Sequence, residues 1–214
     1  MMNRSERAFF AKHDPAVLSA LRRSVVGIAG AGGLGSNVAF ALARAGVGKL
    51  IIADFDRIEV SNLNRQQYFW RQVGRVKVEA LVENLKSIQP FSDYVGRRAK
   101  VTRKTVAALF GEADLLIEAF DRAGQKEMLI ESWISAFPTR PVIAASGLSG
   151  FGRNARIKQR KAGTLYICGD EESEPKPGIS PMAPRVGVVA HMQANLAVEL
   201  LVKIKRGRSH VQGQ

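Results

Sequence analysis

The sequence VVGIAGAGGLGSNVAFALARAGVGKLIIADFDRIEVSNLNRQQ occupies residues 25–67 and carries the clearest pattern in the chain. An apolar run leads into a glycine-rich turn, a helical segment follows, and a second apolar run ends at Asp54. Gly30, Gly32 and Gly35 fit the pattern G-x-G-x-x-G. These glycines allow a tight turn, close approach of the backbone to a ligand, and tight packing of helix on strand. The pattern predicts a nucleotide site.

The remainder of the chain alternates predicted strands and helices. Strands are expected over residues 24–29, 49–53, 93–99, 114–118 and 141–145, and helices over 14–22, 33–45, 76–88, 103–110, 122–136 and 184–204. The first helix begins with Asp14 as N-cap and Pro15 at its first position. A polar segment over residues 169–181 is expected to be a mobile loop. The alternation predicts a single α/β domain over residues 1–214, Rossmann-like, with a largely parallel sheet and helices on both faces.

Composition narrows the possible functions. The hydrophobic share of 46% is enough for a core. We find no apolar run near the ~20 residues of a membrane span and no secretory signal, so we expect a cytoplasmic protein. Lys and Arg number 32 against 19 Asp and Glu, and the net charge of +13 favours acidic partners such as nucleotides, an acidic protein or RNA. The basic clusters are scattered over residues 97–104, 153–161 and 203–208, which is more typical of solvated surface than of a nucleic-acid site.

At the glycine turn, NAD and ATP are equally compatible with the sequence. Asp54 has the spacing at which a carboxylate binds ribose hydroxyls in either kind of site, and an ordinary strand–helix turn would also account for the glycines. Beyond Asp54, the sequence places Asn62, Arg65 and Gln66 where a longer phosphate tail would run. Further on, the segment RQVGRVKVEA gathers cations around the start of a helix, where they oppose the helix dipole unless an anion binds them. We therefore favour phosphate contacts by Arg65 and Lys77, while Arg71 and Arg75 could equally be solvated surface charges.

At GAGGLGS, DFDRIEVSNLNRQ and GRVKVEA the sequence resembles the ThiF/MoeB/HesA family. These relatives of ubiquitin-activating enzymes adenylate the C-terminal glycine of a small ubiquitin-fold protein. The likeness continues through LIEAFDRAGQK and PMAPRVGVVAHMQANLAVELL, and covers residues 21–203. The segment SNLNRQQYF and the short chain look most like the compact ThiF type, which activates the sulfur carrier for thiamin biosynthesis. The resemblance implies an ATP-dependent adenylyltransferase that uses Mg²⁺, releases pyrophosphate and acts on a ThiS-like carrier with a C-terminal Gly-Gly.

The resemblance also implies which residues form the site. The nucleotide-binding set lies on the glycine turn and in the segment after the second strand: Gly32, Gly33, Asp54, Asn62, Arg65 and Lys77. Arg65 and Lys77 would position the triphosphate and, with Asp121, carry the catalysis. Asp121 would govern the Mg²⁺ ion that draws pyrophosphate away. From the residues alone, Asp121 could also be the N-cap of the helix that follows it.

Further implications concern assembly, zinc and the single cysteine. Family members are usually homodimers in which an N-terminal arginine reaches the partner's ATP, and either Arg4 or Arg7 could serve. Many relatives bind structural zinc through two C-x-x-C pairs, whereas this chain keeps only Cys168, so we infer no zinc site. The loop over residues 169–181 offers Ser180 and no cysteine for a covalent step. We interpret Cys168 as a packed, inert thiol.

The expected reaction is attack of the carrier's C-terminal carboxylate on the α-phosphorus of ATP. A carboxylate is already nucleophilic, so positioning and charge neutralisation suffice without a general base. The small residues over 145–152 could leave a channel for the carrier's tail, closed over by the loop 169–181. Three alternatives remain open: a tRNA threonylcarbamoyladenosine dehydratase-like enzyme, which the charge would suit; an NAD-dependent dehydrogenase, which leaves Arg65 and Lys77 unexplained; and a nucleotide sensor, which would not need Asp121 and Lys77.

Overall fold

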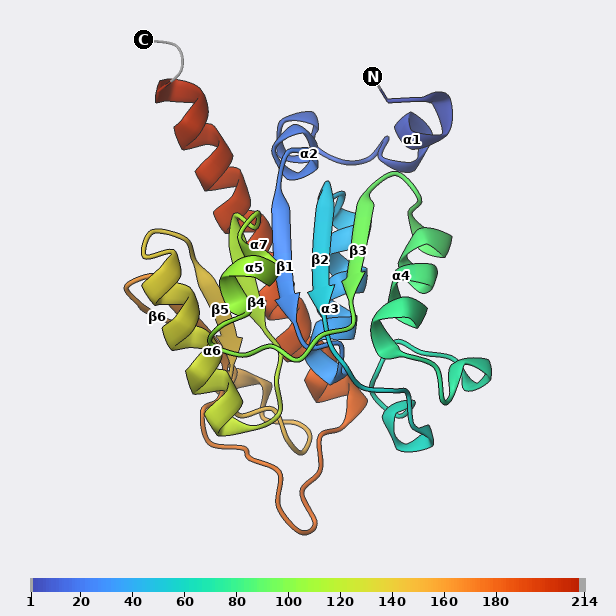
Figure 1. Ribbon diagram of the computed structural model, residues 1–214, viewed down its shortest axis with the longest axis vertical. Coiled ribbons are helices and arrows are strands. Elements are labelled where there is room, and N and C mark those ends of the chain that lie inside the picture. Colours follow the sequence, from blue (N-terminus) through green and yellow to red (C-terminus); the bar gives the residue numbers. More distant parts are fainter. Residues whose placement is uncertain (1, 212–214) are drawn as a thin grey trace.

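The computed structural model describes residues 2–211, with side chains described as far as residue 207. Seven strands form one sheet in the order β3-β2-β1-β4-β5-β7-β6 (Figure 1). The pairs among β1–β5 and β7 are parallel, and β6 runs antiparallel to β7. The strands are β1 (Val25–Ala29), β2 (Lys49–Ala53), β3 (Asp93–Arg97), β4 (Leu115–Glu118), β5 (Val142–Ala145), β6 (Lys158–Ala162) and β7 (Leu165–Gly169). The predicted Rossmann-like, largely parallel sheet is confirmed.

The strand order reverses between β1 and β4, at the centre of the sheet. From β1 the chain moves outward through β2 to β3, then returns to β4, which pairs with β1 from Val26↔Leu115 to Ala29↔Glu118. The loops that leave the carboxyl ends of these two strands lead to helices on opposite faces of the sheet, and in open α/β sheets a crevice forms between such loops. Ligands of open α/β sheets bind at such a switch point.

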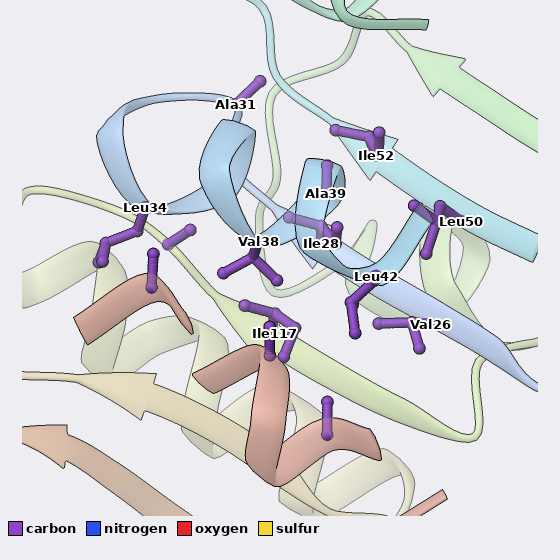
Figure 2. Close-up of a cluster of buried hydrophobic side chains, with 14 of the residues drawn as sticks. Val26, Ile28, Ala31, Leu34, Val38, Ala39, Leu42, Leu50, Ile52 and Ile117 are labelled. Atoms are coloured by element: carbon purple, nitrogen blue, oxygen red, sulfur yellow. The ribbon is translucent and has the colours of Figure 1, made fainter. Parts of the chain in front are cut away.

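Helices cover both faces of the sheet, and each face has its own apolar core. The helices α3 (Gly33–Ala45), α4 (Lys77–Ile88) and α7 (Ala183–Val211) share one core, and α5 (Val106–Phe110) and α6 (Ala123–Ala136) share the other (Figure 1). In the first core, side chains of α3 such as Val38 and Leu42 lie over Val26 and Ile28 of β1 and Ile117 of β4 (Figure 2).

The long helix α7 has a composition that the sequence analysis did not anticipate. Its segment Ala183–Gly207 is long and apolar enough to cross a membrane by length and mean hydropathy, and 44% of its most apolar window is buried. In the fold α7 lies along α3, with Val189, Ala197 and Leu201 in the core. The apolar side chains of α7 therefore contribute to the core between that helix and the sheet.

The N-terminal segment lies at the amino ends of the strands, away from the crevice (Figure 1). Here α2 (Pro15–Arg22) has Asp14 as its N-cap, and the Asp14 carboxylate accepts from the Ala16 amide at 2.8 Å. The predicted start of this helix is confirmed. The preceding helix α1 (Arg4–Phe9) was not predicted, and an ion pair between Glu6 and Arg22 holds it against α2.

The hairpin β6–β7 was also not predicted as strands. All five residues of β6 are exposed, because this strand forms an edge of the sheet, and its sequence KQRKA belongs to a cluster that we interpreted as solvated basic surface. Three short 3₁₀ segments, η1 (Val60–Asn62), η2 (Trp70–Gln72) and η3 (Asn154–Arg156), lie in loops. Residues 170–182, which follow β7, contain no helix or strand in the described structure.

Candidate nucleotide site at the carboxyl ends of β1 and β4

The glycine turn links β1 to α3 and has two positions that admit no side chain. Gly30 has φ +102°, and a Cβ atom added there would lie 2.7 Å from the carbonyl oxygen of Ala119. At Gly35 an added Cβ would lie 1.9 Å from the carbonyl oxygen of Gly30. Gly32 is the N-cap of α3 and Gly33 its first residue, so free backbone amides of the first turn lie beside the crevice. A helix N-terminus of this kind favours an anionic ligand.

Asp54, the predicted ribose ligand, lies directly beside this turn. Its Oδ2 atom accepts a hydrogen bond from the Ala31 amide at 2.7 Å, and its Oδ1 atom accepts from the Asp56 amide at 2.8 Å. The residue is partly exposed. Each carboxylate oxygen can accept more than one hydrogen bond, so Asp54 can hold the turn and still accept from ribose hydroxyls.

Arg65 lies over the start of α3. A Cβ atom on Gly33 would be 3.6 Å from Arg65 Cγ, so the side chain passes close to the helix N-terminus. Its guanidinium donates to the carbonyl oxygen of Ser61 at 3.1 Å and to Asn64 Oδ1 at 2.8 Å, and it remains partly exposed. These are neutral partners, so its charge is available to a phosphate.

The neighbouring Gln66 lies in the segment where the sequence predicts a phosphate tail, although the sequence assigned it no role of its own. It is buried, and its Nε2 atom would be 3.8 Å from a Cβ on Gly32. Its Oε1 atom is buried and has no hydrogen-bond partner among the described residues. A buried acceptor next to the glycine turn fits a hydroxyl or amino group of a nucleotide. The available signal was its place after Arg65 in SNLNRQQYF.

The Asn62 side chain stabilises the local structure of the segment that follows β2. The side chain is buried, and its Oδ1 atom accepts from the Glu59 amide at 3.1 Å, which caps η1. Its carbonyl oxygen accepts from the amides of Arg65 and Gln66 at 3.2 and 3.0 Å. Asn62 therefore shapes the segment that carries Arg65, and a direct contact with ATP stays a prediction.

Lys77 is the first residue of α4 and is buried. Its Nζ atom lies 3.0 Å from Asp56 Oδ2, so the ammonium is paired with a half-exposed carboxylate next to Asp54. The Tyr68 hydroxyl lies next to the glycine turn and donates to the carbonyl oxygen of Ala31 at 2.7 Å. Burial, together with the charges of Asp54 and Asp56, raises the pKa of Tyr68 above its ordinary value, so its hydroxyl remains a donor.

Arg71 and Arg75 belong to the protein surface. The guanidinium of Arg71 lies 5.0 Å from the centre of the Phe69 ring, and Arg75 pairs with Glu83 at 2.6 Å. Of the cations around the start of α4, the structure therefore places Lys77 beside the crevice residues and gives the two arginines partners on their own surface.

Asp121 lies in the loop between β4 and α6, on the other side of the switch point. The N-cap of α6 is Arg122, so the alternative that Asp121 caps this helix is wrong. Asp121 is exposed and makes no hydrogen bond or ion pair within residues 2–211. A carboxylate with no partner fits Mg²⁺, which is commonly held by one or two carboxylates together with substrate phosphates.

A second polar feature at the end of β4 was not predicted. Glu118 is fully buried, and its Oε2 atom lies 2.9 Å from the Nζ atom of Lys126 on α6. Burial raises the pKa of Glu118, while Lys126 and the Phe120 and Ala145 amides oppose that rise.

A pocket of about 420 Å³ opens between the loop after β5 and the start of α7. Its walls come from residues 149–153, from the loop 169–181 that was predicted to close over a channel, including Ser173 and Ser180, and from Met182. Arg185, which also lines the pocket, forms a buried ion pair with Asp170 at 2.5 Å. Burial alone would raise the pKa of Asp170, but hydrogen bonds from Ser173 and Glu172 and the charge of Arg185 lower it to about 2.

Cys168 has no exposed surface in β7, and burial raises its pKa to about 12. The interpretation of a packed thiol is therefore confirmed for its burial.

Residues 2–211 contain no cluster of three or more His, Cys, Asp or Glu side chains that could hold a metal ion. The expected absence of a zinc site stays a prediction, and the end of the tail considered for it, residues 212–214, lies outside the described residues.

Comparison with known proteins places this chain in a family. The model described as the ThiF family matches residues 4–213. The chain belongs to the ThiF family. Among curated ThiF relatives, the molybdopterin-synthase adenylyltransferase of Escherichia coli K12 is 30% identical over 187 residues, which cover 85% of this chain and 74% of that protein. The adenylyltransferase and sulfurtransferase uba4 of Emericella nidulans is 29% identical over 195 residues, and this chain spans 40% of its length.

Solved structures confirm the fold. The E. coli tRNA N6-threonylcarbamoyladenosine dehydratase in complex with AMP matches with a TM-score of 0.86 at 20% identity, covering 97% of this chain and 99% of that one. The same dehydratase in complex with ATP matches with a TM-score of 0.82 at 21% identity. A likeness over nearly the whole of both chains shows the same arrangement of strands and helices in this ThiF-family chain.

Proposed function

We propose that this chain is an adenylyltransferase that uses ATP and Mg²⁺ to adenylate the C-terminal glycine of a small ubiquitin-fold sulfur carrier, as a homodimer in the cytoplasm. The observation that carries the proposal is the placement of Asp54, Arg65 and the start of α3 at one switch point. The two curated relatives described above are both named adenylyltransferases, which supports the same reaction class.

This chain's residues suit positioning and neutralisation. Asp54 would hold the ribose, and the amides at Gly32 and Gly33 with Arg65 would hold phosphates. Lys77 would exchange its partner Asp56 for a phosphate oxygen. The carboxylate of the carrier needs no base. The site must instead align that carboxylate with the three phosphates of ATP and offset the repulsion among these four anionic groups. Neutral backbone donors and two cations at the crevice meet that requirement.

Asp121 is the residue that would hold Mg²⁺ at the edge of β4. The metal ion, when bound, would supply positive charge for the departing pyrophosphate. The donor chemistry fits, because Asp121 is exposed and without a protein partner in the described chain. With one such carboxylate, most of the remaining ligands would be phosphate oxygens and water.

The pocket between residues 149–153 and the loop before α7 supports a route for the carrier's tail. It lies beyond the carboxyl end of β5, the neighbour of β4, and is lined by Gly150, Gly152 and Gly178 among others. Three of its lining residues are glycines, which leaves room for the two small residues at the end of a Gly-Gly tail. Ser149 Oγ and Arg185 Nε are buried without partners among the described residues, so both could donate to peptide carbonyls.

The test is exchange of labelled pyrophosphate into ATP in the presence of candidate carriers. We expect exchange with a carrier whose Gly-Gly tail is intact, and none with the same carrier truncated by those two residues. Thiamin biosynthesis is the pathway proposed for a ThiS-like carrier. If a ThiS-like carrier fails while another ubiquitin-fold carrier with an intact Gly-Gly tail supports exchange, that assignment is corrected and the reaction class stays in place.

A second candidate is activation of a carboxylate on tRNA. The likeness to the tRNA N6-threonylcarbamoyladenosine dehydratase over 99% of its chain and the net charge of +13 favour it. Against it, the basic residues of β6 and the loops are spread over the surface. The same assay discriminates the two proposals: AMP formation with threonylcarbamoyl-modified tRNA and no exchange with any carrier would establish the second.

A further inference from the structure

A buried ion pair joins the carboxyl ends of β4 and β5. The ladder between these strands pairs Leu116 with Val142 and Ile117 with Ile143, and ends there. Beyond it, Lys126 Nζ lies 2.9 and 3.1 Å from the two carboxylate oxygens of Glu118 and donates to the carbonyl oxygen of Ala145 at 3.1 Å. Burying an ion pair costs free energy unless its remaining hydrogen bonds are made. The position of this pair beside the proposed nucleotide site therefore suggests that it has a function there.

The same carboxylate bends the chain that follows β4. Glu118 Oε1 accepts from the Phe120 amide at 2.7 Å, two residues further along. Between them, the Ala119 amide donates to the carbonyl oxygen of Ala29 at 3.0 Å, and the Ala119 carbonyl oxygen lies 2.7 Å from the position that a Cβ on Gly30 would take. Residues 119 and 120 are thus fixed between the glycine turn and Glu118.

Asp121 is the next residue, and its own side chain does nothing to fix its position. It is exposed and has no hydrogen bond or ion pair within residues 2–211. The direction in which its carboxylate leaves the loop is therefore set by the backbone at Phe120, and that backbone is held by Glu118. Lys126, in turn, holds the Glu118 carboxylate from the first turns of α6.

We propose that Glu118 and Lys126 are positioning residues for Asp121, holding the loop 119–121 so that its carboxylate meets the metal-bound phosphates. Neither side chain touches the nucleotide. The inference rests on the proposed ATP–Mg²⁺ site, and it predicts that the pair matters for binding of the metal–nucleotide complex more than for ATP alone.

Two double variants separate this role from a merely structural one. Glu118→Gln with Lys126→Met removes both charges and keeps an oxygen that can accept from the Phe120 amide. Glu118→Leu with Lys126→Met also removes both charges and offers no acceptor. Both avoid an unpaired buried charge, so both should fold, and thermal unfolding checks that they do.

The measurement is the affinity for a non-hydrolysable ATP analogue, by calorimetry, with Mg²⁺ and with EDTA. With Mg²⁺ we expect the Glu118→Gln double variant to stay within about twofold of the wild type, and the Glu118→Leu double variant to bind about tenfold more weakly or worse, the scale usual for groups that orient metal ligands. With EDTA, both should match the wild type.

A matched control lies at the other end of β4. There Lys205 Nζ lies 2.7 Å from Asp114 Oδ2, and both side chains are largely buried. Lys205→Met should lower the unfolding temperature and leave the effect of Mg²⁺ on nucleotide affinity unchanged. Equal affinities for the two double variants, or an equal loss with EDTA, would overturn the positioning role while the proposed adenylation stands. A wild type that does not bind the analogue with Mg²⁺ would overturn both.

Discussion

Lys77 Nζ lies 3.0 Å from Asp56 Oδ2, so the lysine expected to hold the triphosphate is paired with a carboxylate beside the ribose residue. A phosphate must compete with Asp56 for this ammonium. The Asp56 amide also donates to Asp54 Oδ1 at 2.8 Å, so the ribose and phosphate ends of the site are joined through one residue.

Lys77→Ala should therefore slow carrier-dependent pyrophosphate exchange strongly. Loss of a preorganised cation is worth about 2–4 kcal/mol of barrier by comparison with other electrostatic catalysts. Asp56→Asn is the matched variant: it releases the ammonium from its partner, and we expect ATP affinity to stay equal or to rise. Full activity of Lys77→Ala would show that this lysine serves only Asp56.

Arg65→Ala should have a loss of similar size, with little change in the unfolding temperature. The guanidinium lies over the start of α3 and its partners are a carbonyl and an amide oxygen, so its removal leaves no buried charge. Arg71→Ala is the control, because Arg71 lies over the Phe69 ring on the surface. If both variants lose activity equally, proximity to Gly33 is not what matters.

The wild-type protein should be stabilised by ATP with Mg²⁺ rather than by NAD. Ligand that binds the folded chain raises its unfolding temperature progressively with ligand concentration. A thermal-shift titration with each nucleotide measures this. A rise with NAD and none with ATP–Mg²⁺ would favour the dehydrogenase alternative.

Asp170→Asn should destabilise the chain by about 3 kcal/mol, because it leaves Arg185 buried without its counter-charge. The pKa of Asp170 is lowered from 3.8 to about 2, so its stabilising contribution is present above pH 3.8 and is lost as the pH falls toward 2. The difference in unfolding free energy between wild type and variant should shrink across that interval in denaturant titrations. A difference that stays constant with pH would mean that the carboxylate charge contributes nothing.

Cys168→Ser should leave pyrophosphate exchange nearly intact. The thiol has no exposed surface and a pKa of about 12, so at neutral pH it is neither ionised nor accessible. Mass spectrometry of wild type incubated with carrier and ATP should show no adduct on this residue. An adduct would leave adenylation standing and give the cysteine a role in transfer.

The sequence predicted those parts of the site that local patterns define. The bounds of α3 and β2 follow from the glycine turn and two apolar runs, and Asp54 follows from its spacing. Glu118 and Lys126 were not predicted, because their importance depends on which strands become neighbours, and Gln66 was placed near the phosphate tail without a role of its own. A glutamate at the end of an apolar run, such as Glu118, indicates only the end of a strand. Its contact with Lys126, eight residues later and beside the end of β5, depends on tertiary packing.

The same reason explains the other departures. β6 consists of polar and basic residues, so its periodicity does not distinguish it from a loop, and pairing with β7 alone makes it a strand. The position of Asp121 before a helical segment is typical of an N-cap, but the helix begins one residue later and its N-cap is Arg122.

The position of α1 has a consequence for how arginines from two chains could combine. Arg4 and Arg7 lie at the amino ends of the strands, the full length of the sheet away from the nucleotide crevice of their own chain. Neither can serve that crevice from within the same molecule. If one of them assists ATP binding, the assistance passes between molecules, and specific activity should fall when the protein is diluted until subunits separate. Two inactive variants, one altered at Arg7 and one at Lys77, would then restore activity on mixing, since a mixed pair contains one complete site.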